Sequence, residues 1–125
     1  MAGDGEPSSQ PGGTLVADRS IEGCANVIDV QVERDGETSD GIPTYRFDVT
    51  VQSSDLGWEK YADRWEVVDM TGRMLGERIL THPHETEQPF TRSQAGIPVD
   101  TDRVVVRAHD SVEGFCGADV ELEVS

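Results

Sequence analysis

Strict two-residue alternation is the feature of this chain that most restricts its fold. Between residues 45 and 52 apolar and polar side chains alternate without error, with Tyr45, Phe47, Val49 and Val51 as the apolar members. Successive side chains of a β-strand point to opposite faces, so the pattern predicts a strand with one buried and one solvated face. A helix of the same sequence would scatter these four side chains around its surface.

Similar patterns recur along the chain, and no window shows a sustained helical stripe. Thr71-Gly72 is typical of a hairpin turn, and Asp35-Gly36 and Asp40-Gly41 are further turn signals. The other segments that we predict to be strands are residues 24–33, 65–70, 74–80, 104–109 and 119–124.

About seven strands with turns every 8–12 residues predict an all-β fold. We expect an antiparallel sandwich of the immunoglobulin or fibronectin-III type. An open barrel is the alternative that the same pattern leaves.

The first thirteen residues differ in composition from the rest. Residues 1–13 consist of small, polar and acidic residues and proline after the initial Met, so we expect a flexible tail. Residues 14–125 then form a single β-sandwich domain. The tail has neither the basic start nor the apolar run of a signal peptide. We therefore expect a secreted, periplasmic or surface-anchored protein from which a leader was removed, or a cytoplasmic protein if this N-terminus is native.

The charge balance excludes some classes of partner. The chain carries 25 Asp and Glu against 10 Lys and Arg, a net charge of −15. Nucleic-acid binding through phosphate contacts needs a basic patch, and an anionic membrane would repel such a chain. No apolar stretch has the ~18–20 residues of a transmembrane helix. We expect a monomer that binds an unknown protein or small ligand. The charge itself fits either solubility or adaptation to high salt.

Two cysteines stand 92 positions apart, near the two ends of the predicted domain. Cys24 and Cys116 lack the close spacing of a zinc or redox motif. They either form one long-range disulfide or are two separate thiols. A disulfide would indicate an exported protein.

The most unusual segment is residues 81–93, which holds two of the three histidines. Pro83 keeps this stretch extended, so His82 and His84 are expected to project to the same side. Such a pair can offer two nitrogen ligands to copper, zinc or nickel. His109 falls on the outward side of a predicted strand and is the candidate third ligand. The alternative is a polar loop with solvated histidines.

A second cluster, residues 57–65, holds three of the seven aromatic residues. Trp65 begins a predicted strand and is expected in the core. Trp58 and Tyr61 lie in a connecting stretch beside Asp63. Exposed, they would form a recognition surface; buried, they would plug one end of the sandwich, which is the arrangement that we favour.

Arg92 is expected to pair with Asp63 or Glu87 and to fix its loop, the alternative being an anion-binding role. A hydrolase that uses Glu87 and Arg92 beside the histidines is a third functional hypothesis. No serine has the context of a nucleophile and no Gly-rich phosphate loop is present, so we expect a protein without enzymatic activity.

Three segments resemble a family of small, uncharacterised, mostly exported bacterial β-sandwich proteins. Their marks are a Trp-x-x-Tyr-Ala-Asp-x-Trp segment from Trp58, a His-Pro-His-x-x-Glu-Gln-Pro-Phe-Thr-Arg-Ser segment from His82, and an Ala-x-Asp-Ser segment from Ala108. The resemblance implies a β-sandwich outside the cytoplasm and implies no particular chemistry.

The leading functional hypothesis is an extracytoplasmic binding or interaction module. Its expected ligand-binding residues are Trp58, Tyr61, Asp63, Glu87, Phe90 and Arg92. The alternative is an envelope protein that binds copper or zinc through His82, His84 and His109.

Overall fold

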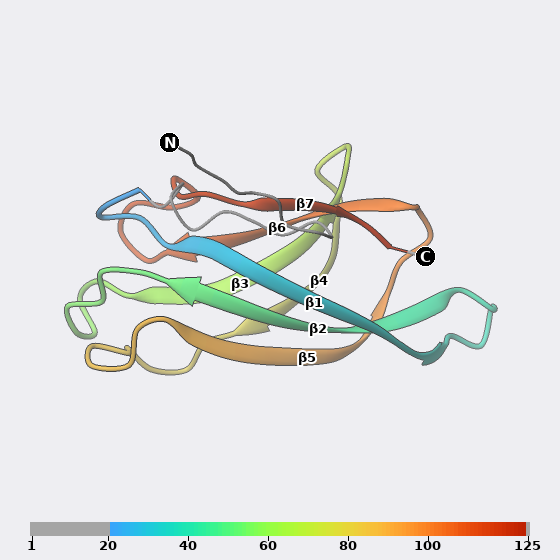
Figure 1. Cartoon of the computed structure of the whole chain (residues 1–125), viewed down its shortest axis with the longest axis horizontal. Coiled ribbons are helices and arrows are strands. Elements are labelled where there is room, and N and C mark those ends of the chain that lie inside the picture. The colour runs from blue at the N-terminus through green and yellow to red at the C-terminus, as the bar shows by residue number, and fades with distance from the viewer. Residues whose placement is uncertain (1–20, 125) are drawn as a thin grey trace, which may run out of the picture.

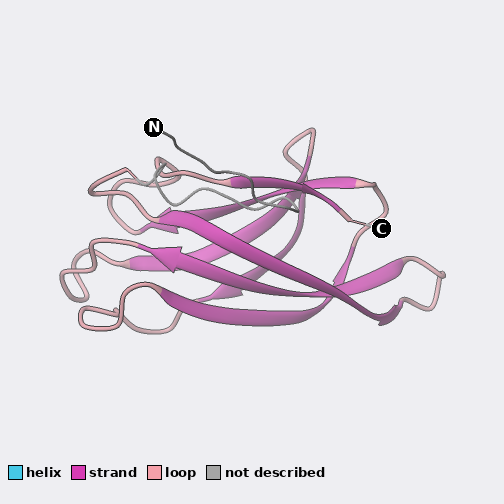
Figure 2. Ribbon diagram, in the orientation of Figure 1, coloured by secondary structure: helices cyan, strands magenta, loops and turns pink. Residues whose placement is uncertain are grey.

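The all-β prediction is confirmed by a computed structural model, which describes residues 21–124. The expected tail, residues 1–13, lies outside the described residues. Seven strands alternate with turns and loops, and Figure 2 shows no helix in the described part of the chain. The strands are β1 (Asn26–Glu37), β2 (Pro43–Gln52), β3 (Ala62–Asp69), β4 (Met74–Ile79), β5 (Phe90–Pro98), β6 (Arg103–Asp110) and β7 (Val120–Glu123).

The strands form two antiparallel sheets that pack face to face. One sheet has the order β1-β2-β5 and the other has the order β4-β3-β6-β7 (Figure 1). A division into three and four antiparallel strands is that of an immunoglobulin-like or fibronectin-III-like sandwich. None of residues 21–124 belongs to a helix with the length and hydropathy that crossing a bilayer requires.

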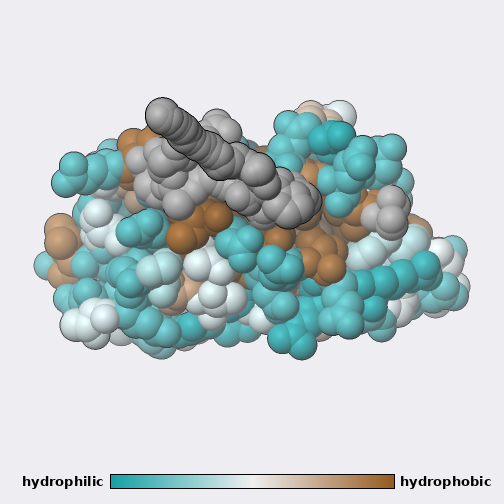
Figure 3. Space-filling view, in the orientation of Figure 1, coloured by the Kyte–Doolittle hydropathy of each residue, from teal (hydrophilic) through white to brown (hydrophobic). Residues whose placement is uncertain are grey.

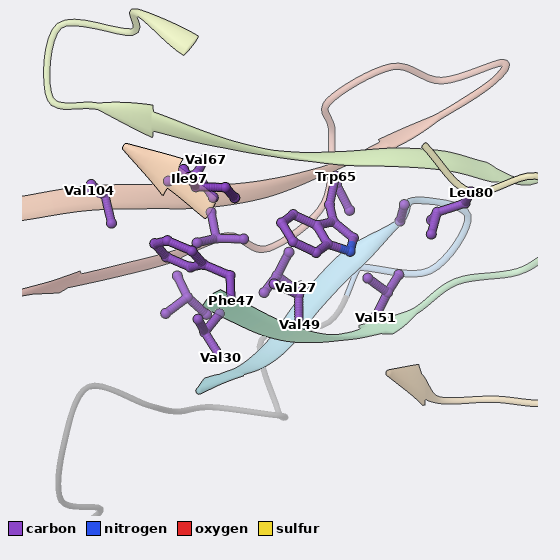
Figure 4. Packing of buried hydrophobic residues seen from close by; sticks show 14 of the residues in the cluster. Val27, Val30, Phe47, Val49, Val51, Trp65, Val67, Leu80, Ile97 and Val104 are labelled. Carbon is purple, nitrogen blue, oxygen red and sulfur yellow. The ribbon is translucent and has the colours of Figure 1, made fainter. Parts of the chain in front are cut away.

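The core lies between the inner faces of the two sheets. Phe47, Val49 and Val51 of β2 are fully buried, as their alternation predicts, and they face Trp65 and Val67 of β3 (Figure 4). Burying an aromatic or aliphatic side chain of this size contributes about 1.5–3 kcal/mol. The apolar face of each strand therefore fixes which of its residues point outward.

Two details of the strand prediction are wrong. Asp35-Gly36 is not a turn, because β1 continues to Glu37. The carboxylate of Asp35 instead accepts hydrogen bonds from Thr44 Oγ1 at 2.6 Å and from the Gly96 amide at 2.8 Å. Strand β5 was not predicted, because its residues between Phe90 and Ile97 are polar or small and carry no clear alternation.

Four loop segments meet at one end of the sandwich. They precede β1, join β2 to β3, join β4 to β5 and join β6 to β7 (Figure 1, left). We call them together the loop end; they are residues 21–25, 53–61, 80–89 and 111–119. The face shown in Figure 3 is mostly hydrophilic, with hydrophobic residues in small separate groups.

Candidate functional site

The aromatic and histidine clusters that the sequence singles out lie at the loop end or on the strand ends beside it. Trp58 and Tyr61 are on the β2–β3 loop, and His82 and His84 are on the β4–β5 loop. His109 is close to the end of β6. The sandwich topology thus brings these residues, which come from segments far apart in the sequence, to one end of the fold.

Asp55 fastens two of these loops to each other. One of its carboxylate oxygens accepts hydrogen bonds from Ser53 Oγ at 2.6 Å and from the Ala62 amide at 3.0 Å. The other accepts the His84 amide at 2.8 Å. Asp55 is buried, so these bonds satisfy an anion that would otherwise be costly to bury. The β2–β3 and β4–β5 loops are therefore held in one arrangement.

A buried ion pair fastens the β6–β7 loop. The Nζ atom of Lys60 lies 2.8 Å from a carboxylate oxygen of Asp110, which is fully buried, and it also donates to the Gly23 carbonyl at 2.8 Å. The other oxygen of Asp110 accepts the amides of Val112 and Glu113 at 3.0 and 2.9 Å. Burial alone would raise the pKa of Asp110, but the hydrogen bonds from Lys60 and these two amides outweigh it, so the pKa is lowered.

The Cys24–Cys116 disulfide fastens the segment before β1 to the same loop. It forms in the structure, so the open question of pairing is settled in favour of the bond. Next to it, Asn26 Oδ1 accepts the Ala118 amide at 2.8 Å. A Cβ atom at Gly117 would overlap the Ala25 carbonyl oxygen, so only glycine allows this close approach.

These anchored loops present apolar side chains to solvent. Trp58 is 67% exposed, and its ring meets that of Tyr61 edge-on, with 5.6 Å between the ring centroids. The plug that we favoured is therefore wrong for Trp58. Leu56, two residues earlier, is 63% exposed, and Val112 is 58% exposed. The amide of Ser111, which precedes Val112, donates to the Tyr61 carbonyl at 2.8 Å, so the two loops lie side by side.

The rim of the loop end is acidic. Its four segments carry seven carboxylates and one lysine, and all of these carboxylates except Asp55 are exposed. The ammonium group of Lys60 is committed to Asp110. Among residues 21–124, no cationic side chain pairs with Glu22, Glu59, Glu85, Glu113 or Asp119, all of which are exposed members of this set.

The two histidines of the β4–β5 loop lie together but differ in environment. Their ring centroids are 4.5 Å apart; His82 is exposed and His84 is buried. The His84 ring stacks on Phe90 at 3.8 Å, and its Nε2 atom lies 3.0 Å from Nη2 of Arg92. Arginine only donates hydrogen bonds, so Nε2 is the acceptor and the ring proton is on Nδ1.

The environment of His84 favours the neutral imidazole. Burial lowers its pKa, and the nearby charge of Arg92 lowers it further. Arg92 also reaches Glu87 at 3.3 Å, which is one of the two carboxylates expected to pair with it. The Nε2 atom of His84 is thus engaged by Arg92 in this structure.

His109 has other neighbours. Its Nδ1 atom lies 2.7 Å from a carboxylate oxygen of Asp63, and its ring meets Phe115 edge-on at 4.8 Å. The guanidinium of Arg107 lies 4.2 Å from the centre of the same phenyl ring. Within residues 21–124, no group of three or more His, Cys, Asp or Glu side chains has the arrangement to hold a metal ion.

Sequence reasoning missed several members of this end. Leu56 and Val112 are single apolar residues in polar stretches, and no sequence pattern marks them as exposed. Asp55 and Asp110 are buried and hold loops in place, but the chain has 25 Asp and Glu residues, so composition does not single these two out. The alternation of β6 did offer one signal, since Asp110 falls on the same parity as the buried Val104, Val106 and Ala108.

Comparisons with known proteins place the chain near one named relative. A protein named "Putative lipoprotein" from Halomicrobium mukohataei is 43% identical over 94 residues, which make up 74% of this chain and 44% of the relative. The chain therefore spans less than half the length of that relative. No protein-family model matches the chain, and no solved structure matches it.

Proposed function

We propose that the protein is a binding or interaction module that works outside the cytoplasm and recognises its partner with the loop end. The exposure of Trp58, on loops that are fixed from several sides, is the observation that carries this proposal. Catalysis and metal binding are not part of it.

Two observations support a location outside the cytoplasm. The Cys24–Cys116 bond belongs to a class of cross-link that persists in oxidising compartments and is rare in the cytoplasm. The relative from Halomicrobium mukohataei carries the name of a lipoprotein. The resemblance to exported β-sandwich proteins points to the same location.

The chemistry of the loop end supports recognition. Tryptophan and tyrosine supply large contact areas at low entropic cost and are the residue types most often found at the centre of interfaces. Trp58, Tyr61, Leu56 and Val112 lie on two adjacent loops, and an ion pair, a disulfide and the Asp55 hydrogen bonds hold those loops in place. Such preorganisation lowers the entropy lost on binding.

Not every residue expected to bind ligand has the exposure for it. Phe90 is 2% exposed and stacks under His84, and Asp63 is engaged by His109. Glu87 and Arg92 pair with each other at the base of the β4–β5 loop. We therefore assign the partner contacts to Trp58 and Tyr61 and add Leu56 and Val112 to them.

The copper or zinc alternative has weaker support. His82 and His84 are adjacent, but Arg92 engages Nε2 of His84, and Nδ1 of that ring is buried. His109 is bound to Asp63 on strand β3. A metal site would have to displace Arg92 and recruit ligands from elsewhere.

A comparative pull-down from cell-envelope extracts tests the proposal. The bait would be the wild-type protein, a Leu56→Ser/Trp58→Ala variant, or a Met70→Ser/Met74→Ala control. Met70 and Met74 are 52% and 49% exposed and lie on either side of the β3–β4 turn, away from the loop end. Loss of Trp58 from the centre of an interface should weaken binding by about 2 kcal/mol, or roughly thirtyfold. The proposal requires partners that the loop-end variant loses and the control retains; equal recovery by both variants would contradict it.

A further inference from the structure

We infer that the partner of the loop end is a basic segment of another polypeptide, which places Arg or Lys side chains over Trp58 and Tyr61. This inference rests on the proposed function and adds the chemistry of the partner. Negative charge surrounds the exposed aromatic pair and favours a cationic ligand.

The carboxylates nearest to Trp58 come from two loops. A Cβ atom built on Gly57 would lie 2.9 Å from Oε1 of Glu59 and 3.4 Å from Oε2 of Glu85. Two carboxylate groups thus converge on the residue that precedes Trp58. Neither has a cationic partner among residues 21–124. Like charges held this close repel each other, and a cation placed between them would relieve that repulsion.

The aromatic pair suits the same kind of ligand. The faces of tryptophan and tyrosine rings carry negative electrostatic potential, and guanidinium and ammonium groups bind over them within about 6 Å. The rings of Trp58 and Tyr61 stand at 74° to each other, so a side chain that covers one ring face can meet the edge of the other. Arginine, with a planar group and an apolar stem, can contact both the rings and a carboxylate.

Further carboxylates around the loop end could contact more than one basic side chain of the partner. Glu113 follows Val112 on the β6–β7 loop, and Glu22 precedes the disulfide. Both are exposed, and neither has a cationic partner in the described part of the chain. An apolar centre with an acidic rim spread over several loops fits a polypeptide segment with alternating basic and apolar residues.

The other occupants are disfavoured by the same charge. A second copy of this chain would bring its own net charge of −15 to the surface. An anionic lipid surface would be repelled for the same reason. Charge complementarity therefore selects a basic polypeptide.

Selection from an unbiased library of random dodecapeptides displayed on phage tests the inference. Wild-type protein is the target, and each selected peptide is then synthesised and its affinity measured for wild type and for Trp58→Ala. The inference predicts peptides enriched in Arg and Lys that lose roughly tenfold or more in affinity with Trp58→Ala. Peptides that depend on Trp58 but are not basic would overturn the inference and leave the proposed function intact. Peptides that bind Trp58→Ala as tightly as wild type would contradict both the inference and the proposed function.

A matched pair of charge variants gives the second readout. The loop-end variant is Glu59→Gln/Glu85→Gln/Glu113→Gln, and the control is Glu33→Gln/Asp40→Asn/Asp102→Asn, which removes the same charge from exposed residues elsewhere. The selected basic peptides should bind the loop-end variant about tenfold more weakly and with a shallower salt dependence, and should bind the control as they bind wild type. Equal weakening by both variants would show attraction to the net charge alone and would overturn the inference. If sedimentation shows that the wild-type protein forms dimers and that Trp58→Ala abolishes them, the partner is a second copy of this chain, and the inference of a basic polypeptide is overturned.

Discussion

Replacing Lys60 with methionine should destabilise the protein strongly, because Lys60 is the only cation within salt-bridge distance of the fully buried Asp110 among the described residues. Removing one partner of a buried ion pair costs about 3–5 kcal/mol, since the other charge stays behind uncompensated. The Val112 and Glu113 amides still bind the carboxylate in the variant, so we expect the lower end of this range, about 3 kcal/mol. For a domain of this size that corresponds to a fall in melting temperature of about 12–20 °C.

Chemical and thermal denaturation followed by circular dichroism would measure this loss. Arg103→Met is the matched control, because Arg103 pairs with Glu121 and Glu123 on the exposed face of the sheet. Exposed pairs contribute about 0–1 kcal/mol, so the control should melt within a few degrees of wild type. Equal melting temperatures for the two variants would refute the assignment of Lys60 as a buried anchor.

The pH dependence of the same variant gives an independent check. The pKa of Asp110 is lowered in the folded protein, so its pairing contributes stability above the unfolded-state pKa of about 3.8–3.9 and loses it as the pH falls through the folded-state pKa. The stability gap between wild type and Lys60→Met should therefore be full at pH 7 and shrink in strong acid. In a double-mutant cycle, Asp110→Asn should restore part of the loss caused by Lys60→Met. A gap that does not change with pH would contradict the role of the Asp110 charge.

Four further outcomes follow from the structure. Because the pKa of His84 is lowered, stability should decline as the pH falls below the ordinary histidine pKa of about 6.5, and His84→Gln should flatten that decline in thermal melts between pH 7 and pH 5. Gly117→Ala should cost about 3 kcal/mol or prevent folding, measured by urea denaturation, because the new methyl group would meet the Ala25 carbonyl. With each quencher scaled to its quenching of free N-acetyltryptophanamide, caesium should quench the fluorescence of Trp58 more than iodide does at equal ionic strength, because the surrounding carboxylates attract the cation, and equal scaled quenching would contradict that charge. Calorimetric titration with zinc or copper at neutral pH should show no dissociation constant below about 100 µM, and tighter binding would support the alternative of a metal site at the histidines.

Much of the fold could be predicted from alternation, because a strand with one buried face has apolar residues at every second position. Strand β2 and the core position of Trp65 are confirmed in this way. Strand β5 was missed because its middle is polar and small, and pairing with β2 defines it instead. Asp35-Gly36 has the composition of a turn, yet hydrogen bonds from Thr44 and Gly96 hold Asp35 in place at the end of β1.

The candidate site was less predictable, because it depends on which loops meet. The sequence could mark Trp58 and Tyr61 as unusual, but their exposure depends on the neighbouring loops. The environment of His109 depends on its pairing with Asp63, a contact 46 positions away in the chain. Long-range contacts of this kind leave no local signal in a single sequence.

The proposed function requires that the loop end, and Trp58 above all, contacts the partner. A photoreactive amino acid at position 112 leaves Trp58 in place and lies on the neighbouring loop; it would be introduced in living cells that produce the protein and compared with the same amino acid at position 70. Both positions are exposed, but only residue 112 lies at the loop end. We predict a discrete cross-linked product from position 112 that position 70 does not give. Identical products from the two positions, or none from position 112, would contradict the proposed function.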